Sequence, residues 1–162
     1  MSLTLRPATP ADAEPILHLH RAAILAAAPG MYDDDVIADW ASPITDAVLN
    51  DYTRHLAKKV ETTLVAEQDG QLLGFAALAS TTNEIRAVYV APRAQGRGVG
   101  TALLSALEAT AQRLDLNVLT VDASLMAEAF YARHGYQRLG PGSKTLHTGL
   151  EMPCVHMRKW LA

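Results

Sequence analysis

The sequence is poor in cysteine, in targeting signals and in long hydrophobic runs. Its 162 residues include one cysteine, Cys154, which excludes an intrachain disulfide and a tetrahedral cysteine zinc site. The first residues lack a basic stretch followed by an apolar one. The most apolar run, residues 22–28, is far shorter than the ~20 residues that cross a bilayer. We therefore expect a cytoplasmic protein that makes no membrane contact.

The chain also lacks an excess of charge of one sign. Its 14 Lys and Arg and 17 Asp and Glu residues give a formal net charge of −3, which does not favour duplex nucleic acid as a partner. Hydrophobic residues make up 49% and charged residues 19%, as in soluble globular proteins rather than disordered ones. The length fits one domain, so we expect residues 1–162 to form a single domain.

The spacing of apolar residues predicts a mixture of helices and strands. Asp69-Gly70 predicts a tight turn between two strands, and Gly135 predicts the end of a helix. The predicted strands are 3–7, 61–66, 72–79, 84–90, 118–121, 136–139 and 152–157, and the predicted helices are 10–28, 33–40, 43–59, 99–114 and 124–134. This order predicts an α+β (mixed α/β) fold in which helices flank a mixed sheet.

A glycine-rich turn joins the predicted strand 84–90 to the predicted helix 99–114. Gly96, Gly98 and Gly100 alternate with other residues at the start of this helix. Glycine permits positive φ angles that let backbone N–H groups converge on an anion, and a helix N-terminus adds positive partial charge. The turn is therefore suited to a pyrophosphate, with Arg97 as a charged contact. A turn that binds no ligand is the alternative.

Two common nucleotide-binding motifs do not fit this turn. A P-loop needs a lysine followed by Ser or Thr after its last glycine, and none follows here. The dinucleotide fingerprint needs a third glycine where the chain has Thr101 or Leu103. Both of these nucleotide-binding interpretations therefore fail on the spacing of the glycines.

Two segments resemble the GNAT superfamily of N-acetyltransferases. Gln95-Gly96-Arg97-Gly98-Val99-Gly100 resembles the family's acetyl-CoA motif, Gln/Arg-x-x-Gly-x-Gly/Ala, and Val88-Tyr89-Val90-Ala91-Pro92 is similar to the strand before it. Ala129-Phe130-Tyr131-Ala132-Arg133-His134-Gly135-Tyr136 resembles the second signature. The resemblance covers about residues 61–140. It implies the GNAT fold, with a central, mostly antiparallel twisted sheet of six to seven strands flanked by helices.

The resemblance also implies acetyl-CoA as co-substrate and assigns its binding residues. The strand before the motif is expected to pair with the pantetheine arm through its backbone, and the turn is expected to hold the pyrophosphate. Amides at a bulge near Val90 are expected to stabilise the oxyanion. The implied cofactor-binding residues are Val88, Tyr89, Val90, Gln95, Gly96, Arg97, Gly98, Val99, Gly100 and Thr101. Ser124 stands where many members have an asparagine that contacts the cofactor, and capping of the next helix is its simpler role.

The implied reaction is direct attack of an amine on the thioester in a ternary complex. Tyr131 matches the tyrosine that many members use as general acid towards the departing thiolate, a step for which a phenol is chemically suited. Glu84 stands where some members place the general base. A core tyrosine and a solvated glutamate are the alternative interpretations of these residues. Tyr136 is expected to be a packing residue.

The sequence gives fewer indications of the acceptor-binding residues. Tyr32 and Trp40 are the expected substrate contacts, because this part of the chain shapes the acceptor pocket in the family. Asp33, Asp34 and Asp35 either attract a cationic amine or begin a helix. No metal site is expected, since His18 and His20 are two residues apart and point to different helix faces.

The resemblance implies an enzyme that moves an acetyl group from acetyl-CoA to a primary amine of a small molecule. It is compatible with a homodimer. Two alternatives share the glycine turn: a non-catalytic sensor that binds acyl-CoA, and an N-acetyltransferase that acts on proteins or peptides.

Overall fold

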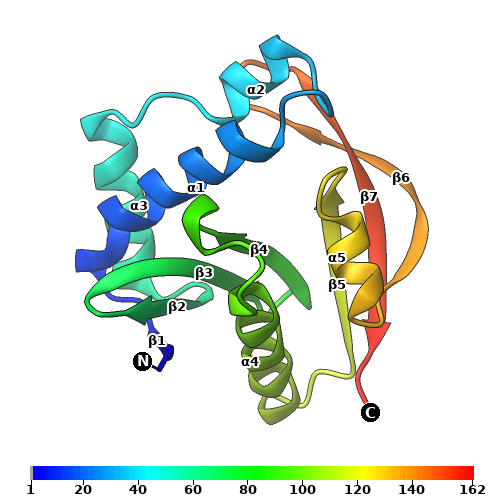
Figure 1. The fold of residues 1–162 in the computed structure, drawn as a ribbon. Coiled ribbons are helices and arrows are strands. Elements are labelled where there is room, and N and C mark those ends of the chain that lie inside the picture. The colour runs from blue at the N-terminus through cyan, green and yellow to red at the C-terminus, as the bar shows by residue number, and fades with distance from the viewer. Residues whose placement is uncertain (1) are drawn as a thin grey trace.

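The computed structural model describes residues 2–162, which form one seven-stranded sheet with helices packed against it (Figure 1). The strands are β1 (Thr4–Pro7), β2 (Thr62–Gln68), β3 (Gln71–Ala79), β4 (Glu84–Val90), β5 (Val118–Ser124), β6 (Gln137–Thr145) and β7 (Glu151–Trp160). The helices are α1 (Ala13–Ala27), α2 (Asp34–Trp40), α3 (Asp46–Lys58), α4 (Val99–Arg113) and α5 (Glu128–Arg133), with short 3-10 turns at Pro10–Asp12 and Pro92–Ala94. The predicted fold class is therefore confirmed.

The strand order β1-β2-β3-β4-β5-β7-β6 places the one parallel pair, β4 and β5, in the middle of the described sheet. These two strands pair only at Glu84 with Thr120 and at Ile85 with Val121. All other neighbouring strands are antiparallel and pair over most of their length. The sheet therefore divides beyond Ile85 into two halves that separate like the arms of a V.

Strand β3 is buried on both faces, which explains its almost continuous apolar sequence. On one face Phe75 stacks on Tyr89 of β4 and meets His20 of α1. On the other face a Cβ atom at Gly74 would lie 2.9 Å from a methyl carbon of Leu103 in α4. Glycine at position 74 is thus required by the close approach of α4 to the sheet.

Several predicted element boundaries are wrong in the C-terminal half. Strand β5 continues to Ser124, and α5 begins only at Glu128, so the predicted helix 124–134 starts too early. Strands β6 and β7 also extend well beyond the predicted 136–139 and 152–157. The reason is tertiary: β7 pairs with β5 on one side and with β6 on the other, which extends all three strands.

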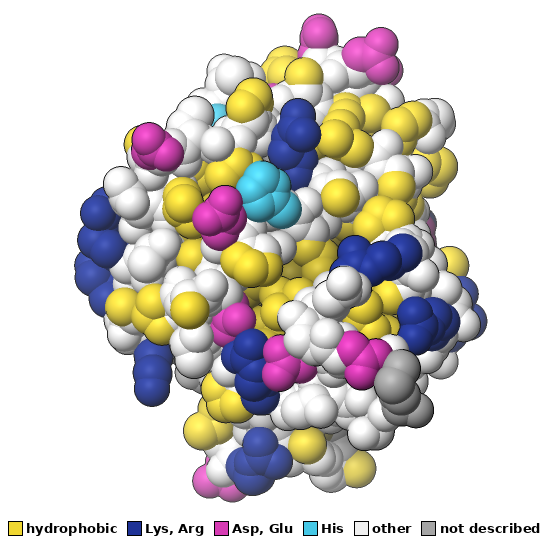
Figure 2. All heavy atoms as spheres, turned by 60° about the vertical axis from the view of Figure 1, so that its left-hand side comes forward, with side chains coloured by type: hydrophobic (Ala, Val, Ile, Leu, Met, Phe, Trp, Pro, Cys, Tyr) yellow, Lys and Arg dark blue, Asp and Glu magenta, His cyan; other side chains and the backbone are white. Residues whose placement is uncertain are grey.

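The face in Figure 2 carries a central hollow floored by hydrophobic side chains. Acidic and basic side chains are interspersed around it, and no broad field of one sign forms on this face. Within residues 2–162, no helix combines the length and the apolar character needed to cross a membrane.

Acid is expected to destabilise the fold through His20. The ring centroid of His20 lies 4.5 Å from that of Tyr89, and burial lowers the pKa of His20 from 6.5 to about 4. Between these pH values the unfolded chain binds a proton at His20 that the folded chain does not, so the free energy of unfolding falls as the pH drops through this window. The full loss amounts to about 3 kcal/mol.

Denaturant unfolding at pH 7 and pH 4.5 measures this effect. The His20→Leu variant is expected to lose about 2–3 kcal/mol less stability between the two pH values than the wild type. His18→Leu is the control, since His18 is exposed on the same helix and should leave the wild-type difference unchanged. An equal loss in the wild type and in His20→Leu would contradict the prediction.

Candidate active site

A cavity of about 630 Å³ opens where β4 and β5 separate. One end is formed by the last residues of β4, the glycine-rich turn and the starts of α4 and α5. The other end is formed by α1, Trp40 of α2, and residues of β6 and β7. The cavity therefore connects the segment that resembles an acetyl-CoA motif with the region expected to take the acceptor.

Most residues predicted to bind the cofactor lie along this cavity. They are Val88, Tyr89, Val90, Gln95, Gly96, Gly98, Val99, Gly100, Thr101 and Ser124. Arg97 is the exception: its guanidinium donates to Oε1 of Gln68 at 2.9 Å, and the residue does not line the cavity. The Arg97 side chain thus points to Gln68 rather than into the cavity, and its predicted phosphate contact stays a prediction.

The glycine turn presents backbone N–H groups to the cavity. Gly96 and Gly98 have φ angles of 75° and 81°, which favour glycine. Helix α4 begins directly afterwards, and its first bond within the helix runs from the Ala102 N–H to the Gly98 carbonyl at 3.0 Å. The N–H groups of Val99, Gly100 and Thr101 consequently have no acceptor among residues 2–162, which leaves them available to an anion.

Contacts between α4 and α5 fix the floor of this anion site. A Cβ atom at Gly100 would lie 3.2 Å from a ring carbon of Phe130, so the two helices meet without a side chain at that position. His134 Nδ1 lies 2.8 Å from the Phe130 carbonyl and Nε2 lies 3.0 Å from Thr101 Oγ1. The proton therefore belongs on Nδ1, and the Thr101 hydroxyl donates to Nε2. Sequence analysis missed both Phe130 and His134 in this role.

Tyr131 is held on α5 as a neutral phenol facing the cavity. Its ring packs edge-on against Phe130 at 5.2 Å and Tyr136 at 5.4 Å between centroids. Its hydroxyl has no hydrogen-bond partner within the described chain. Burial raises the pKa of Tyr131, and nearby Tyr89 raises it further. An uncommitted, protonated hydroxyl on a cavity wall is suited to donating a proton.

The bulge in β4 lies at Arg86 and not near Val90, where it was expected. Ala87 pairs with Ala77 of β3 but Ile85 pairs with Leu78, which leaves Arg86 as the extra residue. Val90 pairs in regular register with Gly74 of β3. Because the bulge bends β4 just beyond its last pair with β5, the backbone of residues 87–90 faces the cavity as a free strand edge.

Glu84, the predicted general base, is not brought to the cavity wall. It lies at the paired end of β4, where its carboxylate accepts a hydrogen bond from Arg86 Nη1 at 2.6 Å. Arg86 also forms an ion pair with Glu61 at 3.3 Å. Arg86 lines the cavity, but Glu84 and Glu61 lie behind it.

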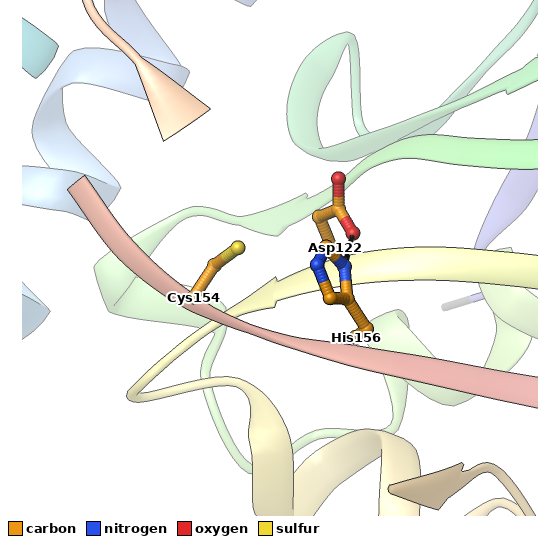
Figure 3. A group of neighbouring side chains, drawn as sticks. All are labelled: Asp122, Cys154 and His156. Atoms are coloured by element: carbon orange, nitrogen blue, oxygen red, sulfur yellow. Dashed lines mark hydrogen bonds and ion pairs between the residues drawn. The ribbon is translucent and has the colours of Figure 1, made fainter. Parts of the chain in front are cut away.

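A different carboxylate, Asp122, lies on the cavity wall. It is opposite His156 in the register of β5 and β7, and Nδ1 of His156 donates a hydrogen bond to its carboxylate (Figure 3). Cys154, two residues earlier on β7, completes a cluster whose polar atoms lie within 4.8 Å of one another. Burial and the charge of Asp122 raise the pKa of the Cys154 thiol, while Lys144 lowers it.

Sequence analysis missed this cluster, although a signal was present. Thr120, Asp122 and Ser124 alternate with apolar residues, which is the pattern of a strand with one polar face. The three clustered side chains are of types that bind transition metals. The carboxylate and imidazole are hydrogen-bonded to each other, and burial favours the neutral thiol at Cys154. The cluster is thus an aspartate–histidine pair with a thiol beside it.

Of the two residues predicted to bind the acceptor, one lines the cavity and the other does not. Trp40 lines the cavity, and its ring centroid lies 5.7 Å from that of Tyr32. Tyr32 lies behind that wall: its hydroxyl donates to the Pro153 carbonyl at 2.7 Å and accepts from the Leu125 N–H at 2.9 Å. Tyr32 therefore ties the segment before α2 to β7 and to the end of β5.

The three neighbouring aspartates belong to a helix start, as one of the two interpretations predicted. Asp33 is the N-cap residue of α2, and Asp34 and Asp35 form its first turn. None of them is among the described residues that line the cavity. Acidic side chains at this position stabilise the helix dipole.

The capping role considered for Ser124 is wrong. Ser124 is the last residue of β5, and Ala127 is the N-cap residue of α5. Only the Ser124 carbonyl takes part in the turn, where it accepts the Ala127 N–H at 2.9 Å. Its side chain is on the cavity wall, so the predicted cofactor contact of Ser124 stays a prediction.

Comparison with known proteins places this architecture in a family. Residues 29–161 match the family model described as an acetyltransferase (GNAT) domain. A solved GCN5-related N-acetyltransferase from Rhodopseudomonas palustris is 31% identical, with a TM-score of 0.89 over 99% of this chain and 97% of that one. Phosphinothricin acetyltransferase from Sinorhizobium meliloti, solved in complex with AcCoA, shares the fold at 22% identity and a TM-score of 0.73 over 100% of this chain and 90% of that one.

A curated relative matches over a shorter stretch. Mycothiol acetyltransferase from Parafrankia sp. is 40% identical over 76 residues, which are 46% of this chain. The match spans 24% of that protein, so this chain covers about a quarter of the length of the relative. Since the family model covers most of the chain and the solved relative from Rhodopseudomonas palustris matches nearly all of it, the chain belongs to the GNAT family of acetyltransferases.

Proposed function

We propose that this protein transfers an acetyl group from acetyl-CoA to a primary amine of a small molecule, by direct attack in a ternary complex. The observation that carries the proposal is that one cavity contains the free N–H groups of the glycine turn, the Tyr131 hydroxyl and the Asp122 carboxylate. Support also comes from structural neighbours solved with coenzyme A or acetyl-CoA and from the mycothiol acetyltransferase relative.

The cofactor end fits a long thioester carrying a pyrophosphate. The N–H groups of Val99, Gly100 and Thr101 would hold the pyrophosphate oxygens, as helix N-termini do. The free edge of residues 87–90 would pair with amide groups of the pantetheine arm, as an added strand pairs with a sheet edge. Both sets of contacts come from backbone atoms, so they place the thioester without relying on flexible side chains.

Asp122 and Tyr131 would handle two protons of the reaction. Asp122 binds the ammonium form of the acceptor, and the Asp122–His156 pair takes the proton that the amine must lose. The amine nitrogen then forms a bond to the acetyl carbon, the carbon–sulfur bond breaks, and the nitrogen loses its second proton to solvent. Tyr131 donates its proton to the departing sulfur and is reprotonated from solvent.

The acceptor end is walled, which favours a small molecule over a peptide. Asp39 of α2 accepts hydrogen bonds from the Thr148 N–H at 3.0 Å and hydroxyl at 2.5 Å. This contact and those of Tyr32 hold the segment around α2 against the turn between β6 and β7. A peptide substrate needs a groove along which its chain can extend, and these contacts fix the segment around α2 beside the acceptor end.

Titration calorimetry with acetyl-CoA, CoA and NAD tests the cofactor. We expect micromolar binding of acetyl-CoA, no binding of NAD, and loss of acetyl-CoA binding in Gly98→Trp. Acetyl-CoA at ~100 times its Kd should stabilise the fold by about 2.7 kcal/mol, or roughly 5–10 °C in Tm.

Gly70→Trp is the matched control for that experiment. Gly70 also has a positive φ, 76°, and open space around it, but it lies in the turn between β2 and β3, away from the cavity. It should carry similar backbone strain and retain acetyl-CoA binding. Failure of the wild type to bind acetyl-CoA would refute the proposed function, whereas binding without turnover on any amine would favour the sensor.

A further inference from the structure

The acceptor end of the cavity is strongly apolar. Trp40, Tyr89, Met126, Leu146 and Met152 line it, together with small alanines of α1. Met152 is almost completely buried and packs with Leu146 and Trp40 in a cluster separate from the main core. A ligand at this end therefore gains most of its affinity by burying an apolar body.

The charges on the cavity wall are few and mostly positive. Asp122 is the one carboxylate among the described residues that line it, whereas Arg86, Arg133 and Lys144 are cationic. Arg86 is already paired with Glu84 and Glu61. A polyamine would find one carboxylate for its several ammonium groups and would be repelled by the remaining cations. The wall thus suits a ligand with a single ammonium group.

Two cations of the wall, Arg133 and Lys144, form no ion pair with any residue from 2 to 162. Arg133 belongs to α5, whereas Lys144 lies on β6, which forms part of the acceptor end. A Cβ atom at Gly142 would lie 2.2 Å from Nε2 of His156, so that position of β6 faces the same side of the sheet as His156. Lys144, two residues further along β6, faces that side as well, and its charge lowers the pKa of the Cys154 thiol.

Lys144 and Asp122 are separated by β7, so their charges lie apart. Strand spacing and register place their Cα atoms about 17 Å from each other. Both residues line the cavity on the same face of the sheet, so the wall presents one negative and one positive group to a ligand that carries both an ammonium and a carboxylate.

We propose that the acceptor is a free amino acid with an apolar side chain, acetylated on its α-amine. This inference rests on the proposed function and specifies its substrate. Asp122 receives the α-ammonium, Lys144 receives the α-carboxylate, and the side chain lies against Trp40, Leu146 and Met152. Direct transfer forms the N–C bond at the α-nitrogen and releases CoA.

Matched pairs of acceptors test the proposal, with release of free CoA thiol as the readout. The pairs are L-phenylalanine and phenethylamine, L-tryptophan and tryptamine, and L-methionine and 3-(methylthio)propylamine, with spermidine as the polycation. In at least one pair the amino acid should exceed its decarboxylated partner in kcat/KM by about five- to tenfold. Spermidine should be a poor acceptor.

The Lys144→Gln variant then identifies the carboxylate contact. It should lower the ratio of kcat/KM for the amino acid to that for its partner amine by about five- to tenfold. Lys58→Gln is the control, because Lys58 is an exposed lysine on α3 far from the wall, and should leave the ratio unchanged.

The outcomes separate this inference from the proposed function. If acetyl-CoA binds but no amine in the panel is acetylated, the proposed function fails and the substrate assignment fails with it. If amines are acetylated but partner amines or spermidine equal the amino acids, the substrate assignment alone is overturned. A ratio that Lys144→Gln leaves unchanged also overturns it.

Discussion

Replacing Asp122 by asparagine is expected to lower kcat/KM by about 10²- to 10⁴-fold while leaving acetyl-CoA affinity unchanged. Asparagine has the same shape, and its carbonyl can still accept the hydrogen bond from His156. It carries no charge for the ammonium and cannot take the proton. The loss should therefore appear in turnover and acceptor KM, measured with the best amine of the acceptor panel, and not in calorimetry with acetyl-CoA.

Glu84→Gln is the matched comparison for this variant. Glu84 also carries a carboxylate and is the first residue of the central strand β4. Its side chain contacts Arg86 and does not line the cavity. We expect its loss to change kcat/KM by less than tenfold. If Asp122→Asn turns over like the wild type and Glu84→Gln does not, the role of general base returns to Glu84, as the family resemblance implied.

Replacing Tyr131 by phenylalanine is expected to lower kcat by about 10²-fold, again without a change in acetyl-CoA affinity. The hydroxyl makes no hydrogen bond within residues 2–162, so its removal should cost little stability. The ring contacts with Phe130 and Tyr136 remain in the variant. The loss would thus report the missing proton donor rather than a packing defect.

Tyr136→Phe provides the opposite pattern. The Tyr136 hydroxyl donates to Glu108 at 2.8 Å, and Lys159 also pairs with that carboxylate at 3.1 Å. Removing the hydroxyl should lower the free energy of unfolding by about 1 kcal/mol and leave kcat unchanged. Wild-type kcat in Tyr131→Phe would show that the thiolate departs without help from this residue.

The parts of the site that could be predicted from sequence are those coded locally. Gly96, Gly98 and the helix after them lie within a few residues, and their roles follow from backbone freedom and helix polarity. Tyr131 was predicted from the family resemblance, which rests on the short segment of residues 129–136. In each case the residues that determine the geometry are neighbours in the chain.

The acceptor side could not be predicted, because strand pairing over long sequence separations creates it. Asp122 and His156 come together only through the register of β5 with β7. Strand β6 contains Gly140, Pro141 and Gly142, which disfavour a strand, and it forms because β7 supplies a partner along its length. The sequence suggested that Tyr32 binds a ligand, but its hydroxyl donates one hydrogen bond and accepts another from the backbone of residues far away in the chain.

The narrow junction between β4 and β5 has a consequence for the cohesion of the molecule. Hydrogen bonds connect the strands within each half-sheet along their length. One half contains β1 to β4 and the other contains β5, β7 and β6, and only two residue pairs of β4 and β5 join the halves. The sheet is thus mechanically weakest along the line where the cavity opens. The hydrophobic core, which contains residues of both half-sheets, therefore carries most of their attachment, and we expect a ligand that pairs with the free edge of β4 to add hydrogen bonds at this gap.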